Sequence, residues 1–228
     1  MNVIQRNVRQ MKAIELFAGT RSISKAFERA GIRSYSVEFD HQHPNIDWYA
    51  DINTITAHDL VERFGIPDVL WASPPCQSYS VAAIGHHRYK GEDGELKPKT
   101  EFALKSDMLL HHTLGIIQTI IEDYNPNLIW FVENPRAGMR KMGCMADLPR
   151  YTVTYCKYGD SRMKPTDIWT NLPDPQFIAP CKNGDSCHDR APRGTRQGTQ
   201  GLVGAVERAR IPDKFCDHIV KICKEAME

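Results

Sequence analysis

The segment 12–40 constrains the fold more than any other part of the chain. Lys12 to Gly19 has the pattern of an apolar strand that ends in a glycine turn, and Ser34 to Asp40 has that of a second strand ending in acids. Between them, residues 23–30 carry apolar side chains at helical spacing, with Ser22 as the expected N-terminal cap. The segment therefore predicts a β-α-β unit with parallel strands.

The same alternation continues along the chain. Because strands alternate with helices, we predict an α/β fold with a doubly wound, mostly parallel sheet. Further strand patterns lie at 68–72, 128–132, 151–156 and 167–170, and helical patterns lie at 57–64, 102–124 and 212–223.

Composition narrows the class of protein. The 228 residues are 41% hydrophobic and 25% charged, and no apolar run approaches the roughly 20 residues that span a bilayer. The N-terminus has no apolar core of signal-peptide length, so we expect a cytoplasmic protein without a membrane partner. Seven cysteines, an odd number, favour thiols or metal ligands over a disulfide framework. A net charge of +1 neither indicates nor excludes nucleic-acid binding.

Cys76 is the strongest candidate for a reactive group. The apolar strand 68–72 is followed by Pro74 and Pro75, which stiffen the loop that leaves the sheet. A lone cysteine is more often a buried structural residue. Ligands of open α/β sheets bind at the carboxyl ends of the strands, however, and the prolines before Cys76 and the hydroxyls after it favour a reactive thiol there.

Two acids end other strands at the same edge. Glu133 and Asn134 follow the apolar strand 128–132 and would face Cys76, although a helix cap is an alternative role for Glu133. Glu38 ends the second strand, where it could accept hydrogen bonds from ribose hydroxyls or serve as a turn residue. With the glycine turn at a helix N-terminus, it outlines a nucleotide-like cofactor site. A single glycine in that turn disfavours NAD.

Together these motifs resemble the cytosine carbon-5 DNA methyltransferase family, especially its small phage-coded forms. The resemblance implies the Rossmann-like fold of methyltransferases that use S-adenosyl-L-methionine. It rests on the order and spacing of the first motif 15–19, Glu38 as the ribose-binding acid, Asp51-Ile52 as the adenine contact, Pro74-Pro75-Cys76-Gln77 as the nucleophile motif and Glu133-Asn134 as the catalytic glutamate motif.

The resemblance also implies the chemistry. The Cys76 thiolate would add to carbon-6 of a flipped-out cytosine, Glu133 would neutralise the ring at nitrogen 3, and Lys164 would contact the cytosine carbonyl. Activation of the thiol by its surroundings is expected. The cofactor-binding residues would be Phe17, Ala18, Gly19, Thr20, Ser22, Glu38, Asp51, Ile52 and Pro75. The nucleic-acid contacts would be Gln77, Ser78, Arg88, Asn134, Arg162, Thr166 and Arg193.

Three features depart from the family pattern. Arg21 and Ser22 replace the usual glycines, and Lys164 and Thr166 occupy the positions of two arginines. The recognition domain is reduced to 171–201, so we predict three parts: a catalytic domain 1–170, a recognition segment 171–201 and a C-terminal part 202–228 whose helix packs back. Short or relaxed sequence specificity would follow, because base readout requires side chains that reach base edges.

Two segments keep more than one interpretation. Residues 81–99 are polar and glycine-bearing, as in a mobile active-site loop or an ordinary surface loop. Cys181, Cys187 and His188 are potential zinc ligands, but their spacing matches no strong signature and no fourth ligand is evident. We therefore predict no metal site.

Alternative functions remain open at this point. Ser73-Pro74-Pro75-Cys76 differs by one residue from the Ser-Pro-Pro-aromatic motif of methyltransferases that modify exocyclic amino groups. An RNA cytosine methyltransferase and a non-catalytic module that binds DNA or S-adenosyl-L-methionine are further possibilities, and a thiol protease fits poorly. The main expectation is a monomer or weak dimer that acts on double-stranded DNA, in host cytoplasm if phage-coded, and protects a phage genome from restriction.

Overall fold

The computed structural model describes residues 10–189 and 204–228. Its core is a seven-stranded sheet in the order β3-β2-β1-β4-β7-β9-β8, in which β9 runs in the opposite direction to the other six strands. The predicted doubly wound, mostly parallel sheet is confirmed. The strands are β1 (Lys12–Leu16), β2 (Arg33–Glu38), β3 (Trp48–Tyr49), β4 (Val69–Ala72), β7 (Ile129–Pro135), β8 (Arg150–Thr154) and β9 (Pro165–Thr170).

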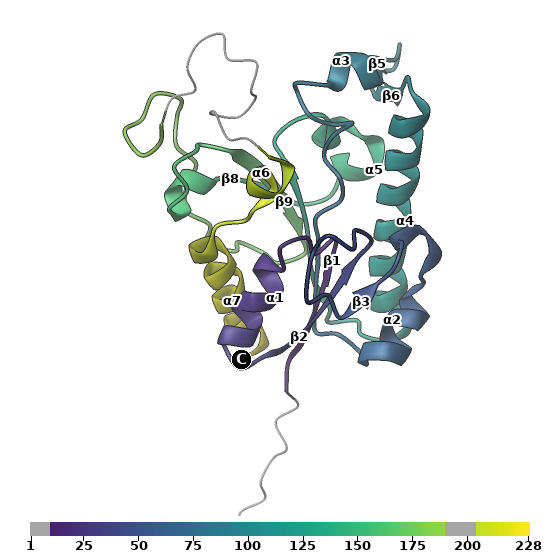
Figure 1. Ribbon diagram of the computed structural model, residues 1–228, viewed down its shortest axis with the longest axis vertical. Helices are drawn as coiled ribbons and strands as arrows, with labels where there is room; N and C mark the ends of the chain where they lie inside the picture. Colours follow the sequence, from purple (N-terminus) through teal and green to yellow (C-terminus); the bar gives the residue numbers. More distant parts are fainter. Residues whose placement is uncertain (1–9, 190–203) are drawn as a thin grey trace, which may run out of the picture.

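Helices cover both faces of this sheet (Figure 1). On one face α1 (Ser22–Arg29) lies against α7 (Asp213–Met227), and on the other α2 (Ala57–Phe64) lies against α4 (Glu101–Asp123). Alternate side chains of β4 lie on opposite faces of the sheet and pack in different hydrophobic cores. Trp71 packs with Phe215 of α7, whereas Leu70 packs in the core beneath α2 and α4. Strands buried on both sides explain the continuous apolar runs in the sequence.

Glu15 caps α1 from inside the protein. Its carboxylate accepts hydrogen bonds from the backbone N–H groups of Ile23 (3.2 Å) and Ser24 (2.8 Å), and the side chain is 2% exposed. Ser22 was predicted to cap this helix, but it is the first helical residue and makes no capping bond. That prediction was wrong because an acid from the preceding strand already satisfies the free N–H groups.

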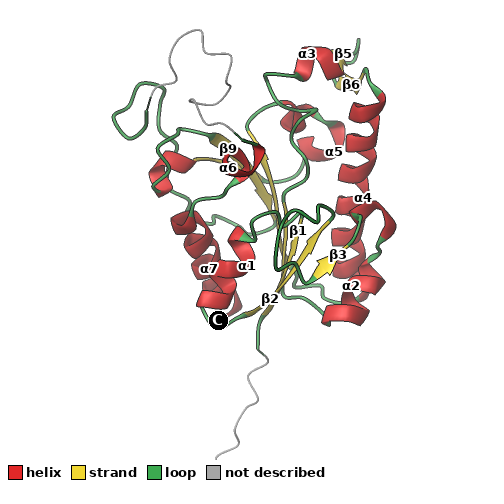
Figure 2. Ribbon diagram, viewed as in Figure 1, coloured by secondary structure: helices red, strands yellow, loops and turns green. Residues whose placement is uncertain are grey.

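The segment 81–99 is folded. It forms a short helix, α3 (Ile84–His87), and a two-stranded hairpin of β5 (Arg88–Lys90) and β6 (Leu96–Pro98). Figure 2 shows this unit above the N-terminal end of α4. Both loop interpretations of this segment are corrected, because a buried ion pair between Arg88 and Asp107 of α4 anchors it.

Short elements complete the fold. Within the described residues no helix is long and apolar enough to cross a membrane.

Residues 171–189, most of the predicted recognition segment, contain neither helix nor strand. The remaining elements are η1 (Ile52–Thr54), η2 (Gly138–Lys141), α5 (Gly143–Ala146), η3 (Tyr155–Tyr158) and α6 (Ala205–Ala209).

Candidate active site

Cys76 lies four residues beyond the carboxyl end of β4, in a fixed turn. Its side chain is partly buried, and its carbonyl accepts hydrogen bonds from the backbone N–H groups of Tyr79 (3.0 Å) and Ser80 (2.9 Å). Tyr79 is itself buried and donates its hydroxyl hydrogen to Asp107 at 2.8 Å. The loop that carries the Cys76 thiol is therefore fixed both before and after Cys76, as the two prolines predicted.

Asn134 ties the Cys76 loop to the neighbouring strand. The parallel register of β4 and β7 pairs Ala72 with Val132, which brings Asn134 beside Pro74. The Asn134 amide donates a hydrogen bond of 2.9 Å to the Pro74 carbonyl, and Asn134 is 1% exposed. We predicted a nucleic-acid contact for this residue. Instead it is buried and holds the loop that carries Cys76.

Glu133 is a buried acid on β7. It is 7% exposed, and the Tyr155 hydroxyl donates a hydrogen bond of 2.9 Å to its Oε1 atom. Burial raises the pKa of the Glu133 carboxyl, and the charge of Lys164 and the bond from Tyr155 offset part of that rise. A carboxyl group in this environment holds its proton more readily than an exposed one, so it is suited to proton donation.

Lys164 completes this group. Its Nζ atom lies 4.8 Å from the centroid of the Tyr155 ring and 3.4 Å from the carbonyl oxygen of Arg210, and the side chain is 9% exposed. Its charge acts on both the Cys76 thiol and the Glu133 carboxyl, lowering the pKa of each. The three predicted catalytic residues thus come together from β4, β7 and the β8–β9 connection.

The surroundings of the Cys76 thiol favour its protonated form. Burial and the charge of Glu133 raise the pKa of the thiol, and Lys164 and Arg208 only partly oppose them. We expected the surroundings to favour the thiolate. Because Glu133 raises the pKa of Cys76 through its negative charge, a proton on Glu133 removes that influence and favours the thiolate.

The turn after β1 is linked to the tip of β2. The backbone N–H of Gly19 donates to one oxygen of Glu38 (2.9 Å), and the other oxygen accepts from Phe39 (2.8 Å) and Asp40 (3.0 Å). Gly19 has a φ of 48°, which glycine adopts without steric cost. Glu38 therefore stabilises the turn, which is one of the two roles that the sequence allowed. It also places a carboxylate at the edge of the sheet where the parallel strands end.

The other predicted cofactor residues differ in exposure. Ile52 and Ala18 are buried, whereas Asp51 is partly buried and accepts a hydrogen bond from the Asn53 backbone at 2.9 Å. The hydroxyls of Thr20 and Ser22 lie 2.9 Å apart in the turn after β1. The remaining residues, Phe17 and Pro75, are partly buried beyond the carboxyl ends of β1 and β4, which are adjacent strands.

Several predicted nucleic-acid contacts lie inside the protein. Arg88 is 3% exposed and pairs with Asp107 at 2.6 Å, while its Nε donates to the Ser78 carbonyl at 2.9 Å. Ser78 is fully buried, and its hydroxyl accepts a further bond from Arg88. Both predictions are corrected, because these groups already satisfy one another. Gln77 alone of this loop is exposed.

The β8–β9 connection gives the same result. Arg162 is 3% exposed and forms an ion pair of 2.7 Å with Asp160. Thr166 is fully buried, and its hydroxyl donates to the Lys164 carbonyl at 3.1 Å. Both side chains are buried against protein groups in the connection that carries Lys164, so both predictions of a nucleic-acid contact are corrected. The predicted contact at Arg193 lies outside the described residues.

Two residues near the thiol and the acid were not predicted. Tyr155 directly follows β8 as the first residue of η3, and the apolar pattern there indicates a buried aromatic but not its bond to Glu133. Arg208 in α6 is exposed, and its charge lowers the pKa of Cys76. Nothing in the sequence places it there, because 132 residues separate it from Cys76 (208 minus 76).

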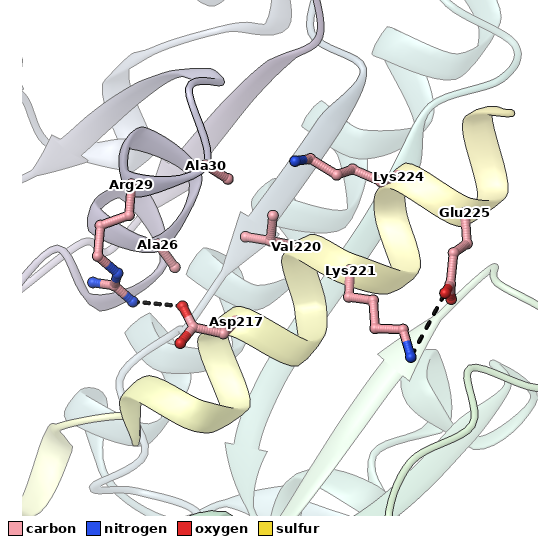
Figure 3. Close-up of a pocket in the computed structure, with 8 residues that line it drawn as sticks. All are labelled: Ala26, Arg29, Ala30, Asp217, Val220, Lys221, Lys224 and Glu225. Atoms are coloured by element: carbon pink, nitrogen blue, oxygen red, sulfur yellow. Dashed lines mark hydrogen bonds and ion pairs between the residues drawn. The ribbon is translucent and has the colours of Figure 1, made fainter.

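A surface hollow between α1 and α7 lies apart from this group (Figure 3). Ala26 and Val220 line it, and the ion pair of Arg29 with Asp217 (2.6 Å) spans its edge. All of its lining residues belong to α1, the C-cap of α1 or α7, so it joins two packed helices and does not include Cys76 or Glu133.

The sequence model of the C-5 cytosine-specific DNA methylase family matches residues 11–134, which include the glycine turn, Cys76, Glu133 and Asn134. The chain belongs to this family. A protein of Frog virus 3 (isolate Goorha), named probable DNA (cytosine-5)-methyltransferase, is 29% identical over 230 residues, covering 93% of this chain and all of the relative. The family match and the relative confirm the expected class of enzyme, a DNA cytosine-5 methyltransferase.

Two solved structures are also similar. The Dnmt2 methyltransferase of S. pombe has a TM-score of 0.49 at 13% identity, covering 71% of this chain and 49% of that one. The methyltransferase EhMeth of Entamoeba histolytica has a TM-score of 0.43 at 12% identity, covering 72% of this chain and 54% of that one. The chain spans about half the length of each.

Proposed function

We propose that this chain methylates carbon-5 of cytosine in double-stranded DNA, with Cys76 as the nucleophile and Glu133 as the proton donor. One observation carries this assignment: adjacent parallel strands present a thiol and a buried carboxyl at one edge of the sheet. Asn134 locks the two strands together at that edge through its bond to Pro74. Chemistry that needs a thiolate and a proton on the same substrate fits this pair.

The residues beyond β1 and β2 fit S-adenosyl-L-methionine. The helical connections diverge to opposite sides between β1 and β4, and such a switch point is where open α/β sheets bind ligands. The Gly19 turn and the Glu38 carboxylate lie on the β1 side of this point, and Cys76 lies on the β4 side. When bound there, S-adenosyl-L-methionine supplies an electrophilic methyl group on its sulfonium sulfur.

The protein residues then act on the base. The Cys76 thiolate forms a bond to carbon-6, the carbon-5–carbon-6 double bond gives its electron pair to carbon-5, and ring nitrogen 3 takes a proton from Glu133. Lys164 faces the cytosine carbonyl. After carbon-5 has gained the methyl group, a base takes the carbon-5 proton, the electron pair of that bond restores the carbon-5–carbon-6 double bond, Cys76 leaves as the thiolate, and nitrogen 3 returns its proton to Glu133. The proton on Glu133 therefore serves twice, since it also lowers the pKa of the thiol.

The target base has to leave the duplex to reach Cys76. Flipping costs a few kcal/mol, and the described site offers Gln77 as an exposed side chain beside the nucleophile. The segment 171–189 is short and irregular, which supports a short or relaxed target sequence. Phage origin, restriction and cytoplasmic location stay predictions.

A methyl-transfer assay tests this function. Duplex DNA is incubated with the protein and S-adenosyl-L-methionine carrying a labelled methyl group, and the DNA is digested to nucleosides. We expect 5-methylcytosine from the wild type and from Cys144→Ala, a matched control at another partly buried cysteine, and none from Cys76→Ala. Label in N4-methylcytosine or N6-methyladenine that survives Cys76→Ala would establish the exocyclic-amino alternative. Transfer to RNA alone would establish the RNA alternative.

A further inference from the structure

Three thiols and an imidazole meet outside the active site. The side chains of Cys156, Cys181, Cys187 and His188 place one ligand atom each within 4.8 Å of all the others. Cys156 and Cys181 are buried, and Cys187 and His188 are partly buried. Within the part of the chain that the structure describes, it is the one group of histidine, cysteine or acidic side chains whose ligand atoms lie close enough together to hold a metal ion.

The separations match a tetrahedral zinc centre. Zinc–sulfur bonds of about 2.3 Å and zinc–nitrogen bonds of about 2.0 Å place tetrahedral ligands roughly 3.5–3.8 Å apart. The Sγ atoms of Cys187 and Cys156 are 3.7 Å apart, and Nδ1 of His188 lies 3.7 Å from Sγ of both Cys181 and Cys187. The separation of Cys156 and Cys181 is shorter, at 3.2 Å. The remaining pairs of ligand atoms lie within 4.8 Å of each other, so small side-chain movements would complete the tetrahedron.

The set of ligand atoms also points to zinc. Thiolate and imidazole ligands select zinc over magnesium or calcium, which prefer oxygen. A disulfide would use two of the three thiols and leave the third thiol and the imidazole unexplained, and all seven cysteines are free here. Four protein ligands fill a tetrahedral site, which is the pattern of a structural centre and not a catalytic one.

The fold supplies the fourth potential ligand that the sequence did not reveal. Cys181, Cys187 and His188 gave three candidates in sequence, and Cys156 lies 25 residues before Cys181 (181 minus 156). It belongs to η3, directly after β8, and only the folded chain brings it to the other three.

A metal at this point would hold an irregular segment against the catalytic sheet. Segments this long without helix or strand are uncommon in compact domains and need another source of order. The backbone N–H of Cys181 donates to Thr154 of β8 (3.0 Å), and that of Asp189 donates to the Ser161 carbonyl (2.8 Å). The cluster thus cross-links 171–189 to η3, whose first residue, Tyr155, bonds to Glu133.

We propose that Cys156, Cys181, Cys187 and His188 bind one structural Zn²⁺ ion, which fixes the 171–189 segment beside the active site. The site does not depend on the proposed reaction, because its ligands are distinct from Cys76 and Glu133. Metal loss would release the segment and, through η3, loosen the support of Tyr155.

Metal content tests this site directly. The full chain, purified under reducing conditions without a metal-affinity tag, is analysed by elemental mass spectrometry, and we expect about one zinc per chain. Cys187→Ser, at the more exposed cysteine ligand, should lose most of the zinc. The matched control Cys144→Ser should keep it, and His188→Cys should keep it as a four-thiolate site.

Cobalt provides a second readout that needs no activity. Chelated protein refilled with Co²⁺ should show intense visible bands of tetrahedral cobalt and a thiolate charge-transfer band, both lost in Cys187→Ser. Wild-type protein without zinc and with only the weak bands of octahedral cobalt would overturn the site. So would a Cys156–Cys181 disulfide in the reduced, freshly purified chain, and so would full zinc content in a folded Cys187→Ser variant.

Discussion

Glu15 should make the stability of this protein depend on pH in an unusual direction. Burial raises the pKa of the Glu15 carboxyl to about 7 from 4.5, despite the hydrogen bonds that it accepts from Ser24 and Ile23. The folded state therefore binds the proton more tightly than the unfolded state. The stabilising contribution is complete below pH 4.5 and is lost as pH rises through about 7.

The size of the effect follows from the shift. A difference of about 2.5 pKa units (7 minus 4.5) at 1.36 kcal/mol per unit gives about 3 kcal/mol in the free energy of unfolding. Urea titrations of the wild type and Glu15→Gln between pH 4 and 8 measure it, since glutamine is neutral throughout. The wild type should lose up to about 3 kcal/mol relative to Glu15→Gln across this window.

Glu62→Gln is the matched control. Glu62 lies at an exposed position of α2, so this variant reports the effect of the same substitution on the surface. A wild type that gains stability relative to Glu15→Gln as pH rises would refute the reasoning. It would mean that the N-terminus of α1 stabilises the carboxylate more than burial opposes it.

Three substitutions test other contacts. Tyr155→Phe keeps the ring but removes a hydrogen bond that lowers the pKa of Glu133, so the alkaline loss of kcat should move to higher pH; an unchanged profile would deny the coupling. Arg88→Met leaves the buried Asp107 carboxylate without its ion-pair partner and should cost about 3–5 kcal/mol of unfolding free energy by urea titration. Asn134→Ala removes the bond to the buried Pro74 carbonyl and should cost about 1–3 kcal/mol of unfolding free energy and lower kcat; unchanged kcat would mean that the loop needs no tether.

Much of the fold was predictable because its signals are local. The apolar run of β4 and the helical spacing of α4 mark their elements, and the rule that parallel strands end at one edge brought Cys76 and Glu133 together. The hairpin of β5 and β6 was missed, because the buried ion pair that anchors it joins residues 19 apart (107 minus 88). Local polarity there indicated only a loop.

The roles of polar residues were harder to predict. Arg88 follows the nucleophile motif and Asn134 belongs to the catalytic glutamate motif, so contact with nucleic acid was the natural inference. The structure buries both against partners that only the tertiary fold supplies, a carbonyl on the adjacent strand and a carboxylate on α4. Cys156 was overlooked as a potential metal ligand for the same reason, because its neighbours come from a segment without regular structure.

Trapping of the covalent intermediate tests the central claim most directly. Duplex DNA with 5-fluorocytosine is mixed with the protein and S-adenosyl-L-methionine, because fluorine at carbon-5 cannot leave as a proton does. We predict a complex that survives denaturation, requires the cofactor, maps to Cys76 by peptide mass and is absent in Cys76→Ala but present in Cys144→Ala. Methyl transfer to ordinary DNA by wild-type protein that never yields such a complex would contradict the assignment of Cys76 as the nucleophile.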